Sequence, residues 1–174
     1  MAISEVLLIG GAAGVGKTSV GWEVSVQLGR LGVAHWHLEG DVLDAAWPRP
    51  IDDLDGDRLT VRTMRAMATV FADEGYERCV YVQTASVAGH HLVREALGDV
   101  AMTGVLLTAT EPTRVGRLAG REIGTDLQRH IEHGATMAGW LEAQAPPWVR
   151  RLATDGETVP VLAGAVINHS GWTR

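Results

Sequence analysis

A short glycine-rich run near the N-terminus has the residue types and spacing needed to bind phosphate. Gly11 is followed by four residues and then by Gly16, Lys17 and Thr18. In such a loop, backbone N–H groups point at phosphate oxygens, the lysine reaches the outer phosphates of a nucleoside triphosphate, and the threonine hydroxyl is a ligand for Mg²⁺. We therefore expect a P-loop that binds ATP or GTP with Mg²⁺, with Thr18 as the metal ligand. The residues expected at the nucleotide are Gly11, Ala12, Ala13, Gly14, Val15, Gly16, Lys17, Thr18 and Ser19.

The context and the composition both support this assignment. The apolar run at residues 6–9 precedes the loop, and a helical pattern follows it from about residue 16, which is the setting that the motif requires. The chain contains fourteen arginines and one lysine, Lys17. A compact, flexible ammonium suits this position better than a planar guanidinium. Lys17 is thus expected to be essential for catalysis.

Two large classes of P-loop protein are excluded because the sequence lacks motifs that they require. Switch-type GTPases read guanine with an Asn-Lys-x-Asp element, which is excluded because the only lysine is in the P-loop. Asp53-Leu54-Asp55-Gly56 matches Asp-x-x-Gly, but no strand precedes it. Motor and transporter ATPases end a core strand with an aspartate that supports Mg²⁺, whereas the third expected strand here ends in Gln83-Thr84. Small-molecule kinases remain.

Asp41 is the candidate for orienting a substrate hydroxyl. It follows an expected strand and Gly40, which puts it at the carboxyl edge of the sheet, where open α/β proteins bind ligands. The alternative is that Asp41 caps a short helix over residues 42–46. Asp44 is a second candidate at the same edge, as a substrate-binding residue.

Arg114, Arg117 and Arg121 are spaced i, i+3 and i+7, which puts them on one face of a helix. Such a face could close over the transferring phosphoryl group and neutralise its charge. We expect Arg117 and Arg121 to be catalytic, with Arg117 also touching the nucleotide. The alternative is a solvated helix face that pairs with Glu111 or Glu122.

A second arginine stripe, Arg58, Arg62 and Arg65, would suit an anionic substrate, and Arg62 is taken as its substrate-binding member. The alternative is again a solvated surface. Trp47, beside Pro48, could stack on a substrate ring or simply cover a loop.

These residues need a scaffold of alternating strands and helices. Apolar runs predict strands near residues 6–9, 33–38, 78–83, 102–109 and 151–154. Periodic stretches predict helices near 16–30, 58–74, 90–97, 126–143 and 159–167, and a further helix starts near residues 111–112. This order predicts an α/β fold, a three-layer sandwich whose five-stranded parallel sheet carries helices on both faces. We expect a single domain over residues 1–174, with a short arginine-bearing lid at about 114–126.

The composition and the N-terminal sequence limit the kinds of partner and the cellular location that we expect. The net charge of −6 gives no electrostatic reason to bind nucleic acid. The N-terminal apolar run is too short for a signal peptide or a membrane span, so a cytoplasmic location is expected. The single cysteine, Cys79, lies in an apolar stretch and is expected to be a buried hydrophobe. A homodimer is compatible with the sequence.

Several motifs resemble those of adenylylsulfate kinases and gluconate kinases. Leu38-Glu39-Gly40-Asp41 resembles the Leu-Asp-Gly-Asp signature of the former and the Gly-Asp of the latter. The helix that opens with Asp57-Arg58 and ends Phe71-Ala72-Asp73-Glu74-Gly75 also resembles the adenylylsulfate kinase pattern. The three arginines from Arg114 to Arg121 resemble the gluconate kinase lid. Ala153-Thr154-Asp155-Gly156 stands where such kinases place a loop at the nucleotide base, which implies that Asp155 and Gly156 bind the nucleotide.

The resemblance implies an ATP- or GTP-dependent phosphotransferase that acts on a hydroxyl of a small molecule. It breaks at the lysine-containing lid of adenylylsulfate kinases, Asp-Pro-Lys-Gly-Leu-Tyr, which has no match here. The reaction type therefore carries over, whereas the acceptor stays open among sugars, nucleosides, adenylylsulfate and antibiotics, because small antibiotic phosphotransferases share the scaffold. The rival functions are a nucleotide-binding sensor or regulatory module without catalysis and a slow hydrolase without an acceptor.

Overall fold

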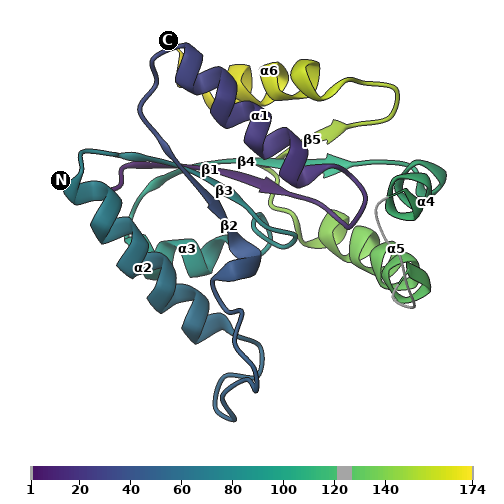
Figure 1. The fold of residues 1–174 in the computed structure, drawn as a ribbon, viewed down its shortest axis with the longest axis horizontal. Coiled ribbons are helices and arrows are strands. Elements are labelled where there is room, and N and C mark those ends of the chain that lie inside the picture. Colours follow the sequence, from purple (N-terminus) through teal and green to yellow (C-terminus); the bar gives the residue numbers. More distant parts are fainter. Residues whose placement is uncertain (1, 121–126, 174) are drawn as a thin grey trace.

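A five-stranded sheet forms the middle layer of the molecule, with every paired strand parallel to its neighbour (Figure 1). The computed structural model describes residues 2–120 and 127–173, and side chains within 2–120 and 133–173. The strand order is β2-β3-β1-β4-β5, which confirms the expected parallel sheet. The strands are β1 (Glu5–Gly10), β2 (Trp36–Glu39), β3 (Arg78–Val82), β4 (Ala101–Thr108) and β5 (Arg150–Ala153).

Helices cover both faces of this sheet (Figure 1), which confirms the three-layer α/β expectation. The two that pack together on one face are α1 (Lys17–Arg30) and α6 (Val159–Ser170). On the other face lie α2 (Asp57–Asp73), α3 (His90–Leu97) and α5 (Leu127–Gln144). Beyond the carboxyl end of β4 lies α4 (Glu111–Ala119), and one 3₁₀ turn, η1 (Gly40–Val42), follows β2.

The core forms because the central strands are apolar on both faces. Val6, Leu7, Leu8 and Ile9 of β1 are each at most 1% exposed, as expected for a parallel strand between two helical layers. The inward stripe of α1, which contains Val20, Val24 and Leu28, packs on one face of this strand layer. Because β1 is buried on both faces, it anchors the P-loop, which begins at the carboxyl end of this strand.

Strand β2 is shorter and later than the sequence indicates, beginning at Trp36 rather than at residue 33. The N–H of Val33 donates to the carbonyl of Leu28 (3.0 Å), so Val33 completes the end of α1 and does not pair with the sheet. The chain reaches the sheet only at Trp36, whose side chain is buried. The hydrophobic pattern predicted a strand in the right part of the chain. Its first residues, however, complete the C-terminal end of α1 and are not part of the strand.

A polar chain then ties β2 to α1. His37 lies between Ser25 and Glu39, with Nδ1 2.9 Å from the Ser25 hydroxyl and Nε2 3.1 Å from a Glu39 carboxylate oxygen. The ring also stacks on Trp22, at 4.1 Å between ring centroids. Because η1 follows Glu39 directly, these contacts fix the position from which Asp41 is presented.

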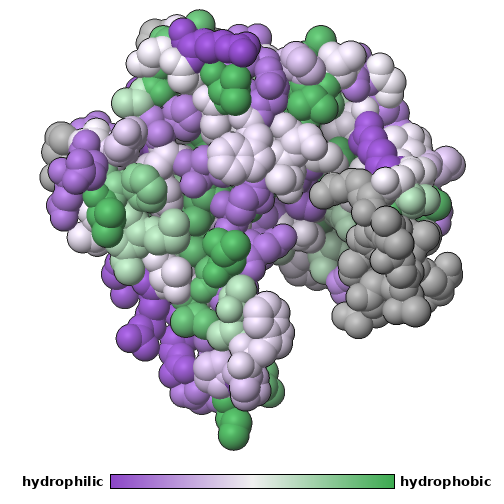
Figure 2. Space-filling model, in the orientation of Figure 1, coloured by the Kyte–Doolittle hydropathy of each residue, from purple (hydrophilic) through white to green (hydrophobic). Residues whose placement is uncertain are grey.

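The loop between η1 and α2 extends away from the sheet and exposes apolar side chains (Figure 2). Trp47, Ile51 and Leu54 are 84%, 93% and 68% exposed. The rest of the face drawn in Figure 2 is mixed in polarity. In the described part of the chain, no helix combines the length and hydropathy needed to cross a bilayer.

Candidate functional site

The P-loop joins β1 to α1 and has the backbone geometry that a phosphate group needs. Gly14 and Gly16 have φ angles of +83° and +96°, in the left-handed region that favours glycine. The Lys17 ammonium donates to the carbonyl of Ala12 (3.2 Å), which folds its side chain back over the loop. The first turn of α1 contains no acidic residue, so no carboxylate on the helix competes for its positive N-terminal end.

Neighbouring backbone crowds the loop so closely that two of its glycines cannot be replaced. A Cβ at Gly11 would lie 2.6 Å from the Leu107 carbonyl oxygen, and a Cβ at Gly14 would lie 2.7 Å from the Arg114 carbonyl oxygen. Both contacts are with backbone, which cannot move aside. The loop therefore fits a phosphate group, with N–H donors, an adjacent ammonium and a free approach to the Thr18 hydroxyl, which lies on an exposed residue.

A cavity of about 330 Å³, here called the nucleotide cavity, opens on one side of the P-loop. Its walls come from the loop and the start of α1, from α4, and from the β5–α6 connection. The lining residues include Gly14, Gly16, Ser19, Val20, Gly116, Arg117, Glu157, Val159 and Leu162. Apolar walls with a few polar groups suit a nucleoside.

Arg117 is held in place on this side by four hydrogen bonds. Its Nη1 donates to the carbonyls of Gly14 (3.4 Å) and Val15 (3.1 Å) and to the Thr154 hydroxyl (2.8 Å). Its Nη2 donates to the Thr154 carbonyl (2.9 Å). Arg117 thus joins α4, the P-loop and the end of β5. This position supports a role at the nucleotide, while the expected role at the transferring phosphoryl group stays a prediction.

Arg114, the first arginine of the stripe, is buried beside the P-loop. Arg114 is only 5% exposed, and its Nε has no hydrogen-bond partner among the described residues. It lines a small apolar cavity with Ala12 and Val15, so a buried positive charge lies against the P-loop. Arg121 lies outside the described residues.

Asp155 follows β5 and is bound to the start of α4. Its carboxylate accepts hydrogen bonds from the Thr113 hydroxyl (2.6 Å), the Thr110 hydroxyl (2.7 Å) and the Thr110 N–H (3.1 Å). The Thr113 and Thr110 hydroxyls lower the pKa of this carboxyl to about 2. Asp155 and Gly156 do not line the nucleotide cavity, whereas Glu157 does. The contact of Asp155 and Gly156 with nucleotide stays a prediction.

A second cavity, about 380 Å³ and here called the acceptor cavity, lies on the opposite face of the sheet near its carboxyl edge. It is lined by the loop before α2, the end of β3, α3 and the last turns of α5. Its polar lining residues are Asp44, Asp55, Asp57, Thr60, Tyr81, Gln83, His91, Trp140 and Gln144. Gly11 N–H donates to the Thr84 carbonyl (3.1 Å), between the lining residues Gln83 and Ala85, so the P-loop adjoins this cavity.

Asp41 and Asp44 both lie beside Tyr81 at this edge. Asp41 is exposed in η1, and Asp44 lines the cavity with its carboxylate 2.6 Å from the Arg49 guanidinium. Burial raises the pKa of the Tyr81 phenol well above its usual range. The Cys79 thiol and the carboxylates of Asp41 and Asp44 add to that rise, so Tyr81 remains a neutral hydroxyl.

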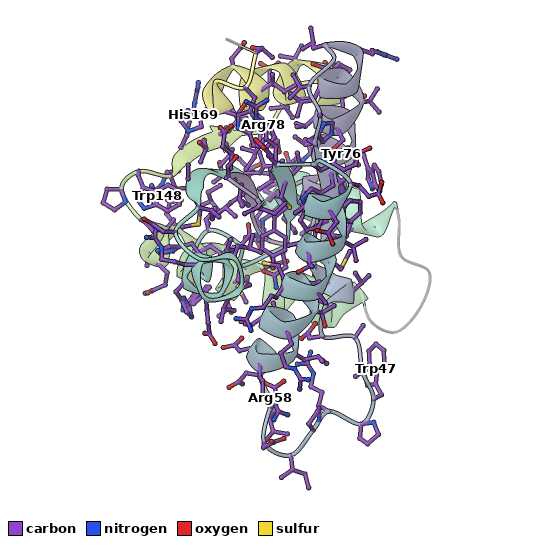
Figure 3. The ribbon with its side chains drawn as sticks, turned by 90° about the vertical axis from the view of Figure 1, so that its left-hand side faces the viewer. Trp47, Arg58, Tyr76, Arg78, Trp148 and His169 are labelled. Carbon is purple, nitrogen blue, oxygen red and sulfur yellow. The ribbon has the colours of Figure 1, made fainter. Side chains whose placement is uncertain are left out.

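The second arginine stripe is not brought into the acceptor cavity. Arg58 pairs with Asp52 at 2.6 Å, and Arg62 is exposed outside both cavities. Trp47 projects from one side of its loop (Figure 3), is 84% exposed and does not line the cavity either. The tryptophan that does line it is Trp140 of α5.

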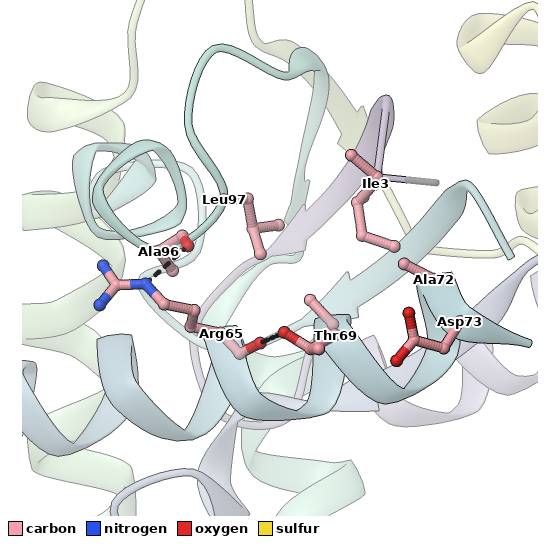
Figure 4. Close-up of a pocket in the computed structure, with 9 residues that line it drawn as sticks. Ile3, Arg65, Thr69, Ala72, Asp73, Ala96 and Leu97 are labelled. Atoms are coloured by element: carbon pink, nitrogen blue, oxygen red, sulfur yellow. Dashed lines mark hydrogen bonds between the residues drawn. The ribbon is translucent and has the colours of Figure 1, made fainter.

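Arg65 lines a different, smaller cavity of about 190 Å³ between α2 and α3 (Figure 4). Its guanidinium donates to the carbonyls of Ala96 (3.2 Å) and Glu95 (2.7 Å). Ile3 lies in the same wall, just before β1, so this cavity is at the amino edge of the sheet, far from the P-loop. Arg65 therefore joins two helices and is remote from phosphate chemistry.

The described residues contain no group of three or more histidine, cysteine, aspartate or glutamate side chains placed to hold a metal ion. A divalent cation would therefore need the phosphate oxygens of a bound nucleotide, with the Thr18 hydroxyl as the protein ligand.

Comparisons with known proteins identify the fold. No family model and no curated protein sequence matches the chain. A gluconokinase from Sinorhizobium meliloti 1021 aligns over 99% of this chain and 93% of its own, with a TM-score of 0.61 and 16% identity. The Deinococcus radiodurans tunicamycin resistance protein aligns over 97% and 96%, with a TM-score of 0.62 and 16% identity. A sugar kinase from Janibacter sp. HTCC2649 aligns over 96% and 94%, with a TM-score of 0.62 and 17% identity. The fold is that of P-loop small-molecule kinases.

Proposed function

We propose that this protein is a phosphotransferase that moves the γ-phosphoryl group of ATP or GTP to a hydroxyl of a small molecule. The observation that carries the proposal is a pair of cavities on opposite sides of one phosphate-binding loop, the first lined by the loop and the second adjoining it at the Gly11–Thr84 hydrogen bond. One is bounded by Gly14, Gly16 and Arg117, and the other by Asp44, Tyr81 and Gln83. A protein that only binds or hydrolyses a nucleotide needs no second cavity on the far side of the loop.

The reaction balances with the residues at hand. The acceptor oxygen forms a bond to the γ-phosphorus while the bond from that phosphorus to the β–γ bridging oxygen breaks, and a nucleoside diphosphate leaves. Asp41 accepts the hydroxyl proton and passes it to solvent. Because the transition state is loose, Asp41 acts chiefly by orienting the hydroxyl. Asp41 does not itself line the acceptor cavity, but it is exposed and close enough to the lining residue Tyr81 to act on its phenol electrostatically, which supports this role.

Positive charge around the P-loop stabilises the phosphates. The Lys17 ammonium lies over the loop, while Arg117 and the buried Arg114 lie beside it. Pre-positioned cations of this kind lower the free energy of the transition state without reorganising. Mg²⁺, held by Thr18 and the phosphates, would neutralise developing charge when bound.

The test is a phosphotransfer screen read by mass spectrometry. The purified protein would be incubated with Mg²⁺, ATP or GTP, and a panel of sugars, nucleosides, adenylylsulfate and hydroxyl-bearing antibiotics. We expect one acceptor class to gain a phosphoryl group, and the Lys17→Ala variant to lose the reaction. Nucleotide binding without any phosphorylated acceptor would leave a sensor module as the better account.

A further inference from the structure

The acceptor cavity carries negative charge and no fixed positive charge. Asp44, Asp55 and Asp57 line it, whereas no arginine or lysine of the described residues does. Residues 41–58 hold six aspartates and two arginines, an excess of four negative charges.

Both arginines of this segment are already engaged. Arg49 donates to Asp44 (2.6 Å), and Arg58 forms two hydrogen bonds with Asp52 (2.6 and 2.9 Å). Within residues 2–120 and 133–173, the carboxylates of Asp55 and Asp57 have no ion-pair or hydrogen-bond partner. Two lining carboxylates therefore remain for a ligand.

A tyrosine in the wall of this cavity also points to a ligand. Tyr81 is 4% exposed and lines the cavity, and no hydrogen-bond partner of its hydroxyl occurs in the described part of the chain. The hydroxyl oxygen is open to the cavity, so a ligand can take the place of water as its hydrogen-bond partner. Gln83, which accepts from Ala85 N–H through its side-chain oxygen, offers its amide group at the same wall.

The aromatic wall suits the same kind of ligand. Trp140 is 46% exposed and lines the cavity opposite the β3 end. The face of an indole attracts organic cations, with the largest gain where water is partly excluded. Carboxylates and an indole together form the chemistry that recognises an ammonium group, while the neutral tyrosine and the glutamine recognise hydroxyls.

We infer that the acceptor is a hydroxylated organic amine, bound as a cation in the acceptor cavity. This inference rests on the proposed function and names the substrate class of the same site. An anionic sugar acid would meet two uncompensated carboxylates and no cation, so the cavity rejects it. The amine is held by Asp55, Asp57 and the Trp140 ring, and one of the hydroxyls lies toward Asp41 and the P-loop.

The experiment compares acceptors of similar shape and different charge. Initial rates of transfer from ATP would be measured for glucosamine, glucose and gluconate, and for kanamycin beside its N-acetylated form. Binding of the same probes to the nucleotide-loaded protein would be measured by calorimetry. We expect kcat/KM for the amines to exceed that of their uncharged counterparts by at least about tenfold, and gluconate to be the poorest acceptor.

Two variants locate the effect. Asp55→Asn removes a lining carboxylate from an exposed loop position and should raise KM for the amine about tenfold with little change in kcat. Asp52→Asn removes the same charge from the same loop but outside the cavity, and should leave KM unchanged.

The outcomes separate this inference from the proposed function. Transfer to glucose or gluconate at rates that match the amines would overturn the inference and leave the kinase intact. Binding of the amines, reduced by Asp55→Asn, without transfer to any probe would overturn the kinase and keep the ligand class. Failure of all five probes to bind would overturn the inference.

Discussion

The two cavities beside the P-loop are built in opposite ways. In the nucleotide cavity the lining arginine is already bound to the protein, because Arg117 makes four hydrogen bonds with the P-loop and Thr154. Beside that cavity, Asp155 is held by Thr110 and Thr113. In the acceptor cavity, Asp55, Asp57 and the Tyr81 hydroxyl have no partner among the described residues. Arg117 in the first cavity is thus positioned by protein contacts before a ligand binds. In the second cavity, polar groups without a protein partner are available to a ligand.

This difference suggests that the first cavity serves to bind the nucleotide and that the second serves to discriminate between acceptors. A pre-organised site loses little entropy on binding and suits a substrate common to many enzymes, such as a nucleoside triphosphate. Unsatisfied polar groups discriminate strongly, because a ligand that leaves them unpaired forfeits their free energy. A substitution in one cavity should therefore spare ligand binding in the other.

The largest effect is expected from Asp41→Asn. Asparagine keeps the size of the side chain but cannot accept the hydroxyl proton, so turnover should fall by about 10²–10⁴-fold. Nucleotide affinity and melting temperature should stay near those of the parent protein, because Asp41 is exposed on the acceptor side. The measurements are turnover with the identified acceptor, a nucleotide titration and a melting curve. Normal turnover with a lower melting temperature would make Asp41 a structural cap.

Arg117→Ala should damage the nucleotide cavity and spare the acceptor cavity. The guanidinium donates to two P-loop carbonyls and to Thr154, so its loss loosens the loop as well as removing a cation. Hydrogen bonds from charged groups contribute roughly 2–3 kcal/mol, so nucleotide affinity should fall by about 30- to 160-fold. Calorimetric titration with ATP and GTP would measure it.

The matched control for that variant is Arg62→Ala, an exposed arginine outside both cavities. It should bind nucleotide as the parent protein does. Equal losses in the two variants would mean that general charge, and not the contacts of Arg117, governs nucleotide binding.

Gly116→Leu tests the shape of the nucleotide cavity without disturbing the fold. Gly116 lies within α4 and lines the cavity, and a Cβ there would meet no atom within 4 Å. A leucine should therefore stabilise the helix by up to about 1 kcal/mol while occupying space meant for the nucleotide. We expect roughly tenfold weaker nucleotide binding with a melting temperature no lower than the parent's.

Gly139→Leu is the control for this variant, since Gly139 is also exposed within a helix and has equally open surroundings. Its nucleotide affinity should not change. If Gly116→Leu also bound nucleotide normally, the base or ribose would have to lie elsewhere.

The smallest effect is expected from Asp155→Asn, and it concerns acid stability. Hydrogen bonds from Thr113 and Thr110 lower the pKa of Asp155 to about 2 in the folded protein. A lowered pKa means that the stabilising contribution is present above the unfolded value of about 4 and is lost as pH falls toward 2. Melting curves between pH 2 and pH 5 should thus fall more gently for the variant, with no such change for Asp73→Asn.

The nucleotide side could be predicted from sequence because its parts are contiguous. Residues 11–19 form a loop whose glycine spacing is dictated by backbone geometry, and the strand and helix around it show the matching periodicity. Helix spacing and the resemblance to the gluconate kinase lid singled out Arg117, which the structure places beside the P-loop. Its four hydrogen bonds were not predictable, because they depend on where β5 ends relative to the P-loop.

The acceptor side resisted prediction because it is assembled from distant segments. Trp140, His91 and Gln83 come from three elements that meet only through the packing of α3 and α5 against the sheet. Each looks like an ordinary surface residue when read in sequence. The stripe through Arg62 was correctly placed on one helix face, but the buried face of α2 turns that stripe away from the cavity.

The hydrogen bond between Gly11 and Thr84 has a thermodynamic consequence. The segment after β3 lines the acceptor cavity through Gln83 and Ala85, and its Thr84 carbonyl accepts a hydrogen bond from the P-loop. Two ligands that press on one strip of backbone are energetically linked, and linkage is reciprocal: any factor by which the acceptor tightens nucleotide binding is the factor by which nucleotide tightens the acceptor. The fold thus offers a single stretch of main chain through which the binding of one substrate can change the affinity for the other.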